Sequence, residues 1–301
     1  MKILRIKASN YKNCVDDFCI DFVAKAKKSE EDKEYELQKI DEELYVYNTV
    51  AIIGKNASGK TSAIELLDCC YDILSTFRVE GSDYNYDGVK LEIVFYDDGY
   101  IYKYNTALKQ DVSLDGKVCF ENQELSRKKY YKTKLKNIYS DEGCEMAKLV
   151  EGNLPEDISI VFFALKKQKM NEVYYKANTD LEKIFSTTFV LMKIYKVSDE
   201  VLQCILKIFD ENIDRLVQKD ENNYIITYRG KEKVLSSGEV IRLLSSGTVR
   251  GLNLYLTAYA SLKYGFDLLV DEIENHHTAN SSQQIARIST LQHYSIHATR
   301  P

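Results

Sequence analysis

The chain has 301 residues, with 41 Lys plus Arg against 46 Asp plus Glu, a formal net charge of −5 and 45% apolar residues. With 13 Gly and 2 Pro, this composition excludes collagen, coiled-coil rods and a mainly disordered chain, and it suits one large domain or a domain with an inserted lobe. No apolar run approaches the roughly 20 residues of a membrane span, and the first residues lack a signal-peptide core, so we expect a cytoplasmic protein with no membrane partner.

The N-terminal residues predict an antiparallel sheet and then a strand, a loop and a helix. Apolar and polar residues alternate over residues 1–23, which predicts a hairpin at the edge of a sheet with its turn near Asn13. Residues 24–44 are densely charged and predict a solvated helix or loop. Residues 45–53 form a β-branched and aromatic run that predicts a strand, and residues 61–74 have helical spacing.

Further along the chain, strands give way to helices and then return. Residues 89–104 predict two strands that extend the first sheet, joined by a turn at residues 97–99. The pattern is mostly helical over residues 125–218, which predicts an inserted helical lobe. A strand at 224–228, a helix at 248–264 and a buried strand at 266–270 follow. The predicted parts are therefore an N-terminal half at 1–124, a helical lobe at 125–220 and a C-terminal half at 221–301, with an atypical tail from residue 275.

One motif carries a specific chemistry. Residues 54–61 read GKNASGKT and fit G-x-x-x-x-G-K-[ST], between a predicted strand and a predicted helix. Such a loop cradles phosphate oxygens with its backbone N–H groups, while Lys60 neutralises the β- and γ-phosphates and the Thr61 hydroxyl holds Mg²⁺. The predicted ATP-binding residues here are Gly54, Lys55, Asn56, Ala57, Ser58, Gly59, Lys60, Thr61 and Ser62.

A pair of acids follows the apolar strand in FDLLVDEIEN. A carboxylate at the end of a buried strand is unfavourable unless it has a partner, and in a doubly wound sheet this strand can lie beside the strand of the P-loop. Asp271 would then reach the Mg²⁺, and Glu272 would act as the general base toward water. Read alone, the same pair is more often an ordinary solvated strand end.

Two LSSG strings precede that strand. In LSSGT, Ser245, Ser246 and Gly247 stand directly before a helix predicted to begin near Arg250, where hydroxyl and N–H groups can meet an anion. Read alone, the string is more often an ordinary Ser-Gly helix cap, and the LSSGE at residues 235–239 competes for the same role. We prefer LSSGT because of its distance to Asp271.

Together, GKNASGKT, LSSGT and LLVDEIEN resemble the ATP-binding-cassette type of ATPase found in SMC, RecF and OLD proteins, and more narrowly the bacterial AAA-annotated ATPases linked to phage defence and abortive infection. The opening ILRIKASNYKN resembles the first strand of that family and its Asn-Phe-Lys element. The resemblance implies an α/β P-loop NTPase of ABC/SMC head type, with an N-terminal antiparallel β region and an inserted helical lobe.

The resemblance also implies a mechanism. Two chains would sandwich two ATP molecules with Mg²⁺, each LSSGT would contact the γ-phosphate held by the other chain, and hydrolysis would reopen the dimer. Asn275 and His276 would lie near the dimer seam, and His297 would match a catalytic histidine of the family. The nuclease domain of OLD proteins is not in this chain, so a separate effector protein would supply any nuclease or toxin activity.

Two further segments depart from the rest of the composition. Residues 275–301 hold all four His and no Asp, Glu or Lys, which suggests a truncated or frame-shifted gene end more than a metal site. Residues 127–136 read RKKYYKTKLK and have six cations around two tyrosines, a pattern that could bind nucleic acid or could be a solvated helix face.

The sequence thus predicts an ATPase that switches through dimerisation, in phage defence or in processes on DNA. The alternative is a nearly inactive nucleotide-binding scaffold that regulates a partner effector. A metabolic kinase is disfavoured, because LSSGT has no role in one.

Overall fold

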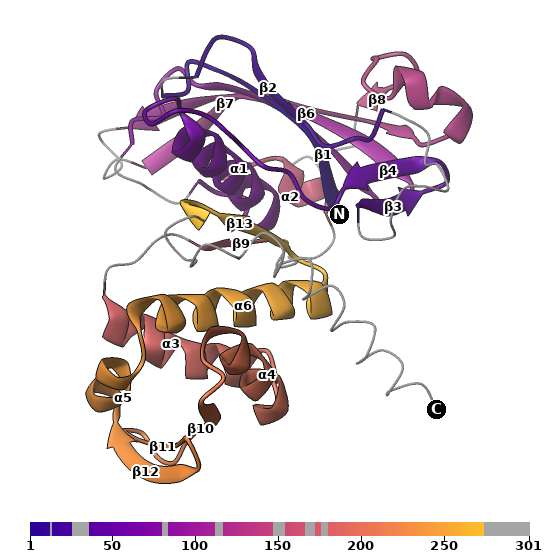
Figure 1. Cartoon of the computed structure of the whole chain (residues 1–301). Helices are drawn as coiled ribbons and strands as arrows, with labels where there is room; N and C mark the ends of the chain where they lie inside the picture. The colour runs from indigo at the N-terminus through magenta and orange to yellow at the C-terminus, as the bar shows by residue number, and fades with distance from the viewer. Residues whose placement is uncertain are drawn as a thin grey trace. The chain divides into compact units, whose positions relative to one another are not determined.

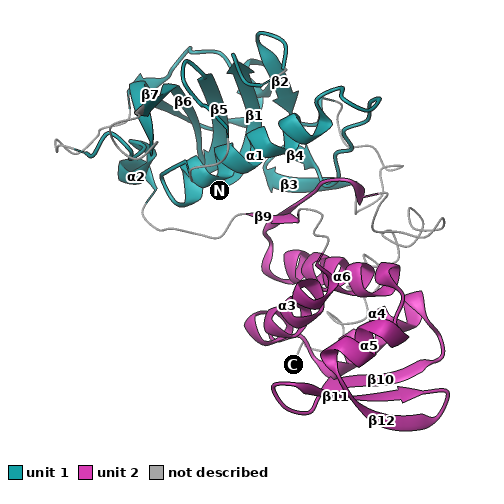
Figure 2. Ribbon diagram, turned by 90° about the vertical axis from the view of Figure 1, so that its left-hand side faces the viewer, with its two compact units in different colours: residues 1–171 teal, residues 172–301 magenta. Residues whose placement is uncertain are grey.

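The computed structural model describes residues 1–12, 14–25, 36–79, 84–111, 117–146, 154–165, 172–175 and 180–273. The chain divides into two compact units, residues 1–171 and 172–301, which we call the first and second unit (Figure 2). Among the described residues, no helix combines the length and the apolar character needed to cross a membrane.

A six-stranded sheet organises the first unit (Figure 1), with the order β2-β1-β5-β6-β7-β8 and every neighbouring pair antiparallel. Both predicted hairpins are confirmed, and the second one extends the first sheet through the pairing of β1 with β5. The strands are β1 (Lys2–Ser9), β2 (Phe18–Asp21), β5 (Lys90–Asp97), β6 (Tyr100–Asp111), β7 (Lys117–Lys129) and β8 (Glu145–Met146).

The predicted helical lobe begins too early. Residues 125–129 form the end of β7, which pairs with β6 from Asp111 back to Tyr100, and this long ladder outweighs the helical spacing of the sequence. The basic residues that follow lie in a 3₁₀-helix, η2, where Lys132, Lys134 and Lys136 are exposed, so the alternative of a solvated helix face holds for these lysines and not for Arg127–Lys129, which belong to β7. The short elements of this region are η2 (Lys132–Asn137) and α2 (Val161–Ala164).

Each face of the sheet has a cover. Helix α1 (Lys60–Ser75) runs along one face in both views, where it buries a stripe of apolar side chains that includes Leu66 and Ile73. On the other face, a hairpin of β3 (Leu37–Asp41) and β4 (Leu44–Tyr47) contributes Leu44 and Val46 to a small core with Leu4, Val94 and Ile138. Leu37–Asp41 therefore form a strand where a helix or loop was expected; residues 26–35 lie outside the described part.

The described part of the second unit combines four helices with a three-stranded antiparallel sheet, and its core is one apolar cluster that includes Phe185, Leu206, Leu216 and Leu252 (Figure 2). The helices predicted inside the lobe are confirmed, yet they share this core with the C-terminal strands and helices. The elements are α3 (Leu181–Ile194), α4 (Asp199–Phe209), β10 (Ile213–Gln218), β11 (Asn223–Tyr228), β12 (Lys231–Ser236), α5 (Ser237–Leu243) and α6 (Ser246–Tyr264).

Helix α6 is fixed on two sides. Gly251 allows a close crossing with α4, because a Cβ built there would lie 2.2 Å from Cζ of Phe209. Toward α3, the buried amide of Asn253 donates hydrogen bonds to Oγ1 of Thr188 (3.0 Å) and to the carbonyl of Ile184 (3.3 Å). A buried polar group that has partners favours one alignment of two helices over others, so these contacts set the register of α6.

Candidate functional site

The predicted strand before the P-loop is shorter than expected. Strand β4 ends at Tyr47, because its partner β3 begins at Leu37, and residues 48–59 have no regular secondary structure. The apolar side chains of Val50 and Ile53 are 46% and 90% exposed. The phosphate-binding segment thus follows the β3–β4 hairpin as an open loop and does not come directly from a strand.

The loop itself has the backbone of a tight phosphate cradle. Ala57 and Gly59 have φ angles of 63° and 89°, values that glycine adopts easily and other residues rarely. A Cβ at Gly54 would lie 2.2 Å from Oγ of Ser58, so a side chain at 54 cannot fit without moving this turn. The amide of Ser58 donates to the carbonyl of Lys55 (3.1 Å), which closes the turn. The backbone conformation therefore favours glycine at 59, and the close approach of the Ser58 side chain favours it at 54.

The loop ends at the first turn of α1, which carries Lys60 and Thr61, the two side chains of the motif expected to contact phosphate and cation. Helix α1 begins at Lys60, and among the described residues no side chain caps it. Its first N–H groups are thus available to an anion, and the helix dipole favours one there. Nζ of Lys60 lies over the loop and donates to the carbonyls of Gly54 (2.9 Å) and Lys55 (3.2 Å), and Thr61 is exposed. These residues fit a nucleotide phosphate with a bound cation.

A contact that sequence patterns did not identify ties the N-terminal strand to α1. Nζ of Lys12 forms an ion pair with the carboxylate of Glu65, one helical turn beyond Thr61. The N–H of Lys12 donates to the hydroxyl of Tyr84 (2.8 Å), and Asn10 and Lys12 both have positive φ angles, 59° and 45°. Strained backbone of this kind often marks functional turns. The two ends of the pair are 53 residues apart, and no local signal links them.

The two acids lie where the sequence predicted, at the end of strand β13 (Asp267–Val270). Asp271 is buried, with 7% exposure, and its Oδ1 accepts the N–H of Glu272 at 3.0 Å. Glu272 is exposed and has a φ of 51°, which turns the chain sharply after the strand. An acid held in this region of backbone space is a candidate for function.

The neighbour of β13 differs from the expectation. Strand β13 pairs in parallel with β9 (Glu172–Tyr175), not with residues 50–53, which are not a strand. The pairing continues past the strand end, where the N–H of Asp271 donates to the carbonyl of Tyr175 (3.3 Å). The carbonyl of Arg250 in α6 accepts the hydroxyl of Tyr175 (3.2 Å). These bonds fix the end that carries Asp271 against helix α6.

The LSSGT string forms the start of α6, which begins at Ser246, two to four residues earlier than predicted. Ser245 is the N-cap, and its Oγ accepts the N–H of Thr248 at 3.0 Å, so the cap interpretation holds for this serine. Ser246 is exposed, and Gly247 is half-buried. A Cβ on Gly247 would meet nothing closer than Oγ of Ser245 at 3.7 Å, which is ordinary contact. Glycine at 247 is therefore not required by packing within the described chain.

The competing LSSGE string has a structural explanation. Ser236 and Glu239 form a capping box at α5, in which the Glu239 carboxylate accepts the N–H of Ser236 at 2.8 Å. That bond lowers the pKa of Glu239, since it favours the charged carboxylate. The helix has seven residues. We assign LSSGE to capping.

The predicted site residues fall into both units. The P-loop belongs to the first unit, whereas LSSGT, Asp271 and Glu272 belong to the second. Asn275, His276 and His297 lie outside the described residues. Within the described ranges, no cluster of three or more His, Cys, Asp or Glu side chains could hold a metal ion.

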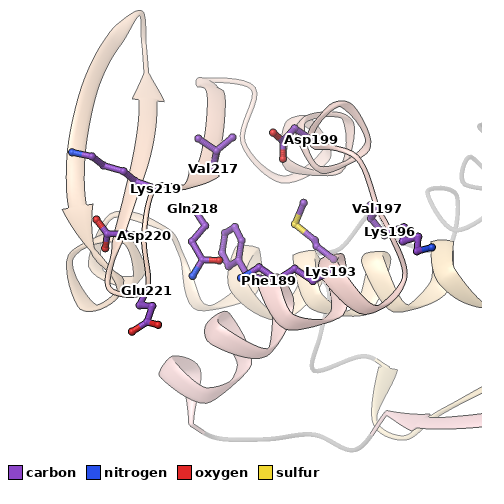
Figure 3. Close-up of a pocket in the computed structure, with 11 residues that line it drawn as sticks. Phe189, Lys193, Lys196, Val197, Asp199, Val217, Gln218, Lys219, Asp220 and Glu221 are labelled. Carbon is purple, nitrogen blue, oxygen red and sulfur yellow. The ribbon is translucent and has the colours of Figure 1, made fainter.

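A separate cavity of about 630 Å³ opens in the second unit between α3, the start of α4 and the end of β10 (Figure 3). Phe189, Met192 and Val217 give it an apolar wall, and positively charged lysines and negatively charged acids surround it. None of the residues predicted from the motifs lines it.

Comparison with known families gives one result. Residues 50–142 match the model of the family described as "AAA domain, putative AbiEii toxin, Type IV TA system", a family of P-loop ATPases. The match indicates an α/β P-loop NTPase fold and a nucleotide-binding ATPase, of a kind that generally binds ATP with Mg²⁺. No curated protein matches the chain.

Proposed function

We propose that this chain is an ATP-binding and ATP-hydrolysing switch protein. One observation carries the proposal: the GKNASGKT loop has a glycine-dependent cradle, and it leads into an uncapped helix with Lys60 over the loop. The family match begins at residue 50, just before this loop, and supports the same activity.

Each residue then has a role. ATP with Mg²⁺ supplies the reactive γ-phosphoryl group and the charge that polarises it. The backbone N–H groups of the loop and of the first turn of α1 bind the phosphates, and Lys60 neutralises them. Thr61 would hold the cation, and Asp271 is its proposed carboxylate ligand. Glu272 orients water and accepts its proton, for which its exposed position at a strained turn is suitable.

The finer part of the proposal is the ATP sandwich of two chains, as in ABC-type ATPases. Gly247 supports it, because a glycine within a helix costs about 1 kcal/mol relative to alanine and nothing inside the described chain requires one there. A ligand that approaches the start of α6 from outside the chain would require glycine at 247, because a side chain there would stand in its way. We therefore propose that Ser246 and Gly247 contact the γ-phosphate held by a second chain.

The biological setting is a proposal as well. The description of the matched family supports a role in toxin–antitoxin or abortive-infection defence, where the switch controls a separate effector protein.

Phosphate release at steady state tests the activity. We expect Lys60→Ala to lose ATP binding, and Glu272→Gln to keep binding and lose hydrolysis by about 10²-fold or more. Lys90→Ala and Glu232→Gln are matched controls, because both remove an exposed charge away from the motifs. Hydrolysis that survives both Lys60→Ala and Glu272→Gln would refute the assignment.

Molar mass in solution tests the sandwich. The Glu272→Gln protein should double its mass only with ATP and Mg²⁺, and a further Gly247→Leu change should prevent this. Gly238→Ala, in the other LSSG string, is the control. ATP binding without a change of mass and without hydrolysis in the wild type would instead support the nucleotide-binding scaffold.

A further inference from the structure

The basic segment at residues 127–136 is divided by the pleat of β7. Arg127 pairs with Tyr102 and Lys129 pairs with Tyr100, so these four side chains share one face of the sheet. Lys128 pairs with Ile101, which lies in the small core on the opposite face. Neighbouring cations in the sequence therefore point to opposite sides.

The cations on the Lys128 side serve the fold. Nζ of Lys128 donates to the carbonyls of Asn137 (3.0 Å) and Ser140 (2.5 Å), which anchors the segment after η2 to the sheet. Burial lowers the pKa of Lys128, as expected for an amine partly removed from water. Lys132 pairs with Glu42 of the β3–β4 turn at 3.1 Å. These two lysines already have partners within the chain.

The cations on the other face are paired with aromatic rings instead. The guanidinium of Arg127 lies 4.9 Å from the ring centroid of Tyr100, and Nζ of Lys129 lies 5.8 Å from that of Tyr131. Lys129 is exposed, and the side chain of Tyr131 is 52% exposed. We call these four residues the Arg-Tyr strip. It combines two cations two residues apart on β7 with the ring of Tyr100 at the start of β6 and the ring of Tyr131 just beyond the end of β7.

We propose that the Arg-Tyr strip binds single-stranded nucleic acid. Cations along an extended strand bind the phosphate backbone, while the exposed ring of Tyr131 stacks on a base that is not paired. A duplex hides its base faces and would use only the cations. An acidic peptide would not gain from the rings in this way. The proposal does not depend on ATP hydrolysis.

One acid opposes this surface. Glu145 on β8 is the direct partner of Arg127, so its carboxylate lies on the same face. Like charges repel, so this carboxylate weakens phosphate binding near Arg127. Its removal should strengthen binding.

Fluorescence anisotropy of labelled 20-nucleotide single-stranded DNA, the same sequence as RNA, and the DNA duplex tests the proposal with the full chain. In Arg127→Gln/Lys129→Gln the slope of log affinity against log salt should become shallower by about 1.4, since each phosphate contact on a single strand contributes about 0.7. Tyr131→Ala should weaken binding about 5- to 150-fold. Glu145→Gln should tighten it.

Lys128→Gln/Lys132→Gln is the matched control, because it removes the same charge from the same segment at the two lysines that already have partners within the chain. Its salt slope should stay within error of the wild type, and thermal unfolding of each variant checks the fold. Equal losses in the two double variants, preference for the duplex, or no binding by the wild type would each overturn the proposal. Binding of DNA, of RNA or of both single strands would support it and define the nucleic acid.

Discussion

Substitution of Gly54 by alanine offers a direct test of the P-loop geometry. The new Cβ would lie 2.2 Å from Oγ of Ser58 and 3.2 Å from its Cβ, well inside ordinary contact of 3.4–4 Å. Overpacking of this kind costs about 1–3 kcal/mol. Because residues 48–59 are an open loop, we expect the loop to shift while the sheet stays folded. ATP binding should therefore weaken about 5- to 150-fold.

A double-mutant cycle isolates the cause. Ser58→Ala removes the atom at 2.2 Å and leaves only the milder 3.2 Å contact. The Gly54→Ala/Ser58→Ala protein should thus bind ATP almost as well as Ser58→Ala alone, with a coupling energy of about 1–2 kcal/mol. Calorimetric titration of ATP with Mg²⁺ measures all four proteins, and circular dichroism verifies their folds. Wild-type affinity in Gly54→Ala, or strictly additive losses in the double variant, would refute the reasoning.

Three further predictions concern stability. Gly251→Ala should lower the free energy of unfolding in urea by about 1–3 kcal/mol, because its Cβ would overlap the Phe209 ring; full stability would contradict the close helix crossing. Ser245→Ala should cost about 1 kcal/mol and Ser245→Gly only a few tenths, in the same assay, if the serine acts as a cap. Burial raises the pKa of Tyr104 to about 12, above its ordinary value of 10. The folded state therefore favours the neutral phenol, so Tyr104 contributes a fall in stability from pH 10 to 12; Tyr104→Phe should make this fall smaller without removing it, because burial also raises the pKa of other tyrosines such as Tyr139.

The parts of the fold set by local sequence were predictable. The helix at residues 61–74 follows from its apolar spacing and exists as α1, and the Asp-Asp-Gly turn places the β5–β6 hairpin. Asp271 at the end of β13 was also predicted, because an apolar run followed by acids is a local pattern.

The parts of the fold that depend on partners distant in the sequence could not be predicted from it. Strand β9 precedes β13 by more than ninety residues, and its four residues give no local signal of that pairing. The basic end of β7 was read as helix, because its partner strand β6, not its own composition, determines its structure. The ion pair of Lys12 with Glu65 likewise depends on tertiary packing. When a site is built from distant segments, the sequence indicates which residue types take part, but it does not indicate which segments come into contact.

The backbone of Glu272 has a consequence for how this position tolerates change. Its φ of 51° costs an ordinary residue about 1–2 kcal/mol, whereas glycine adopts it freely. Glycine at 272 would therefore stabilise the end of β13 and, under the proposed function, remove the general base. Folding and hydrolysis select different residues at this one position, a trade-off between stability and activity. A screen for thermal stability alone would thus tend to choose variants of this chain that bind ATP and no longer hydrolyse it.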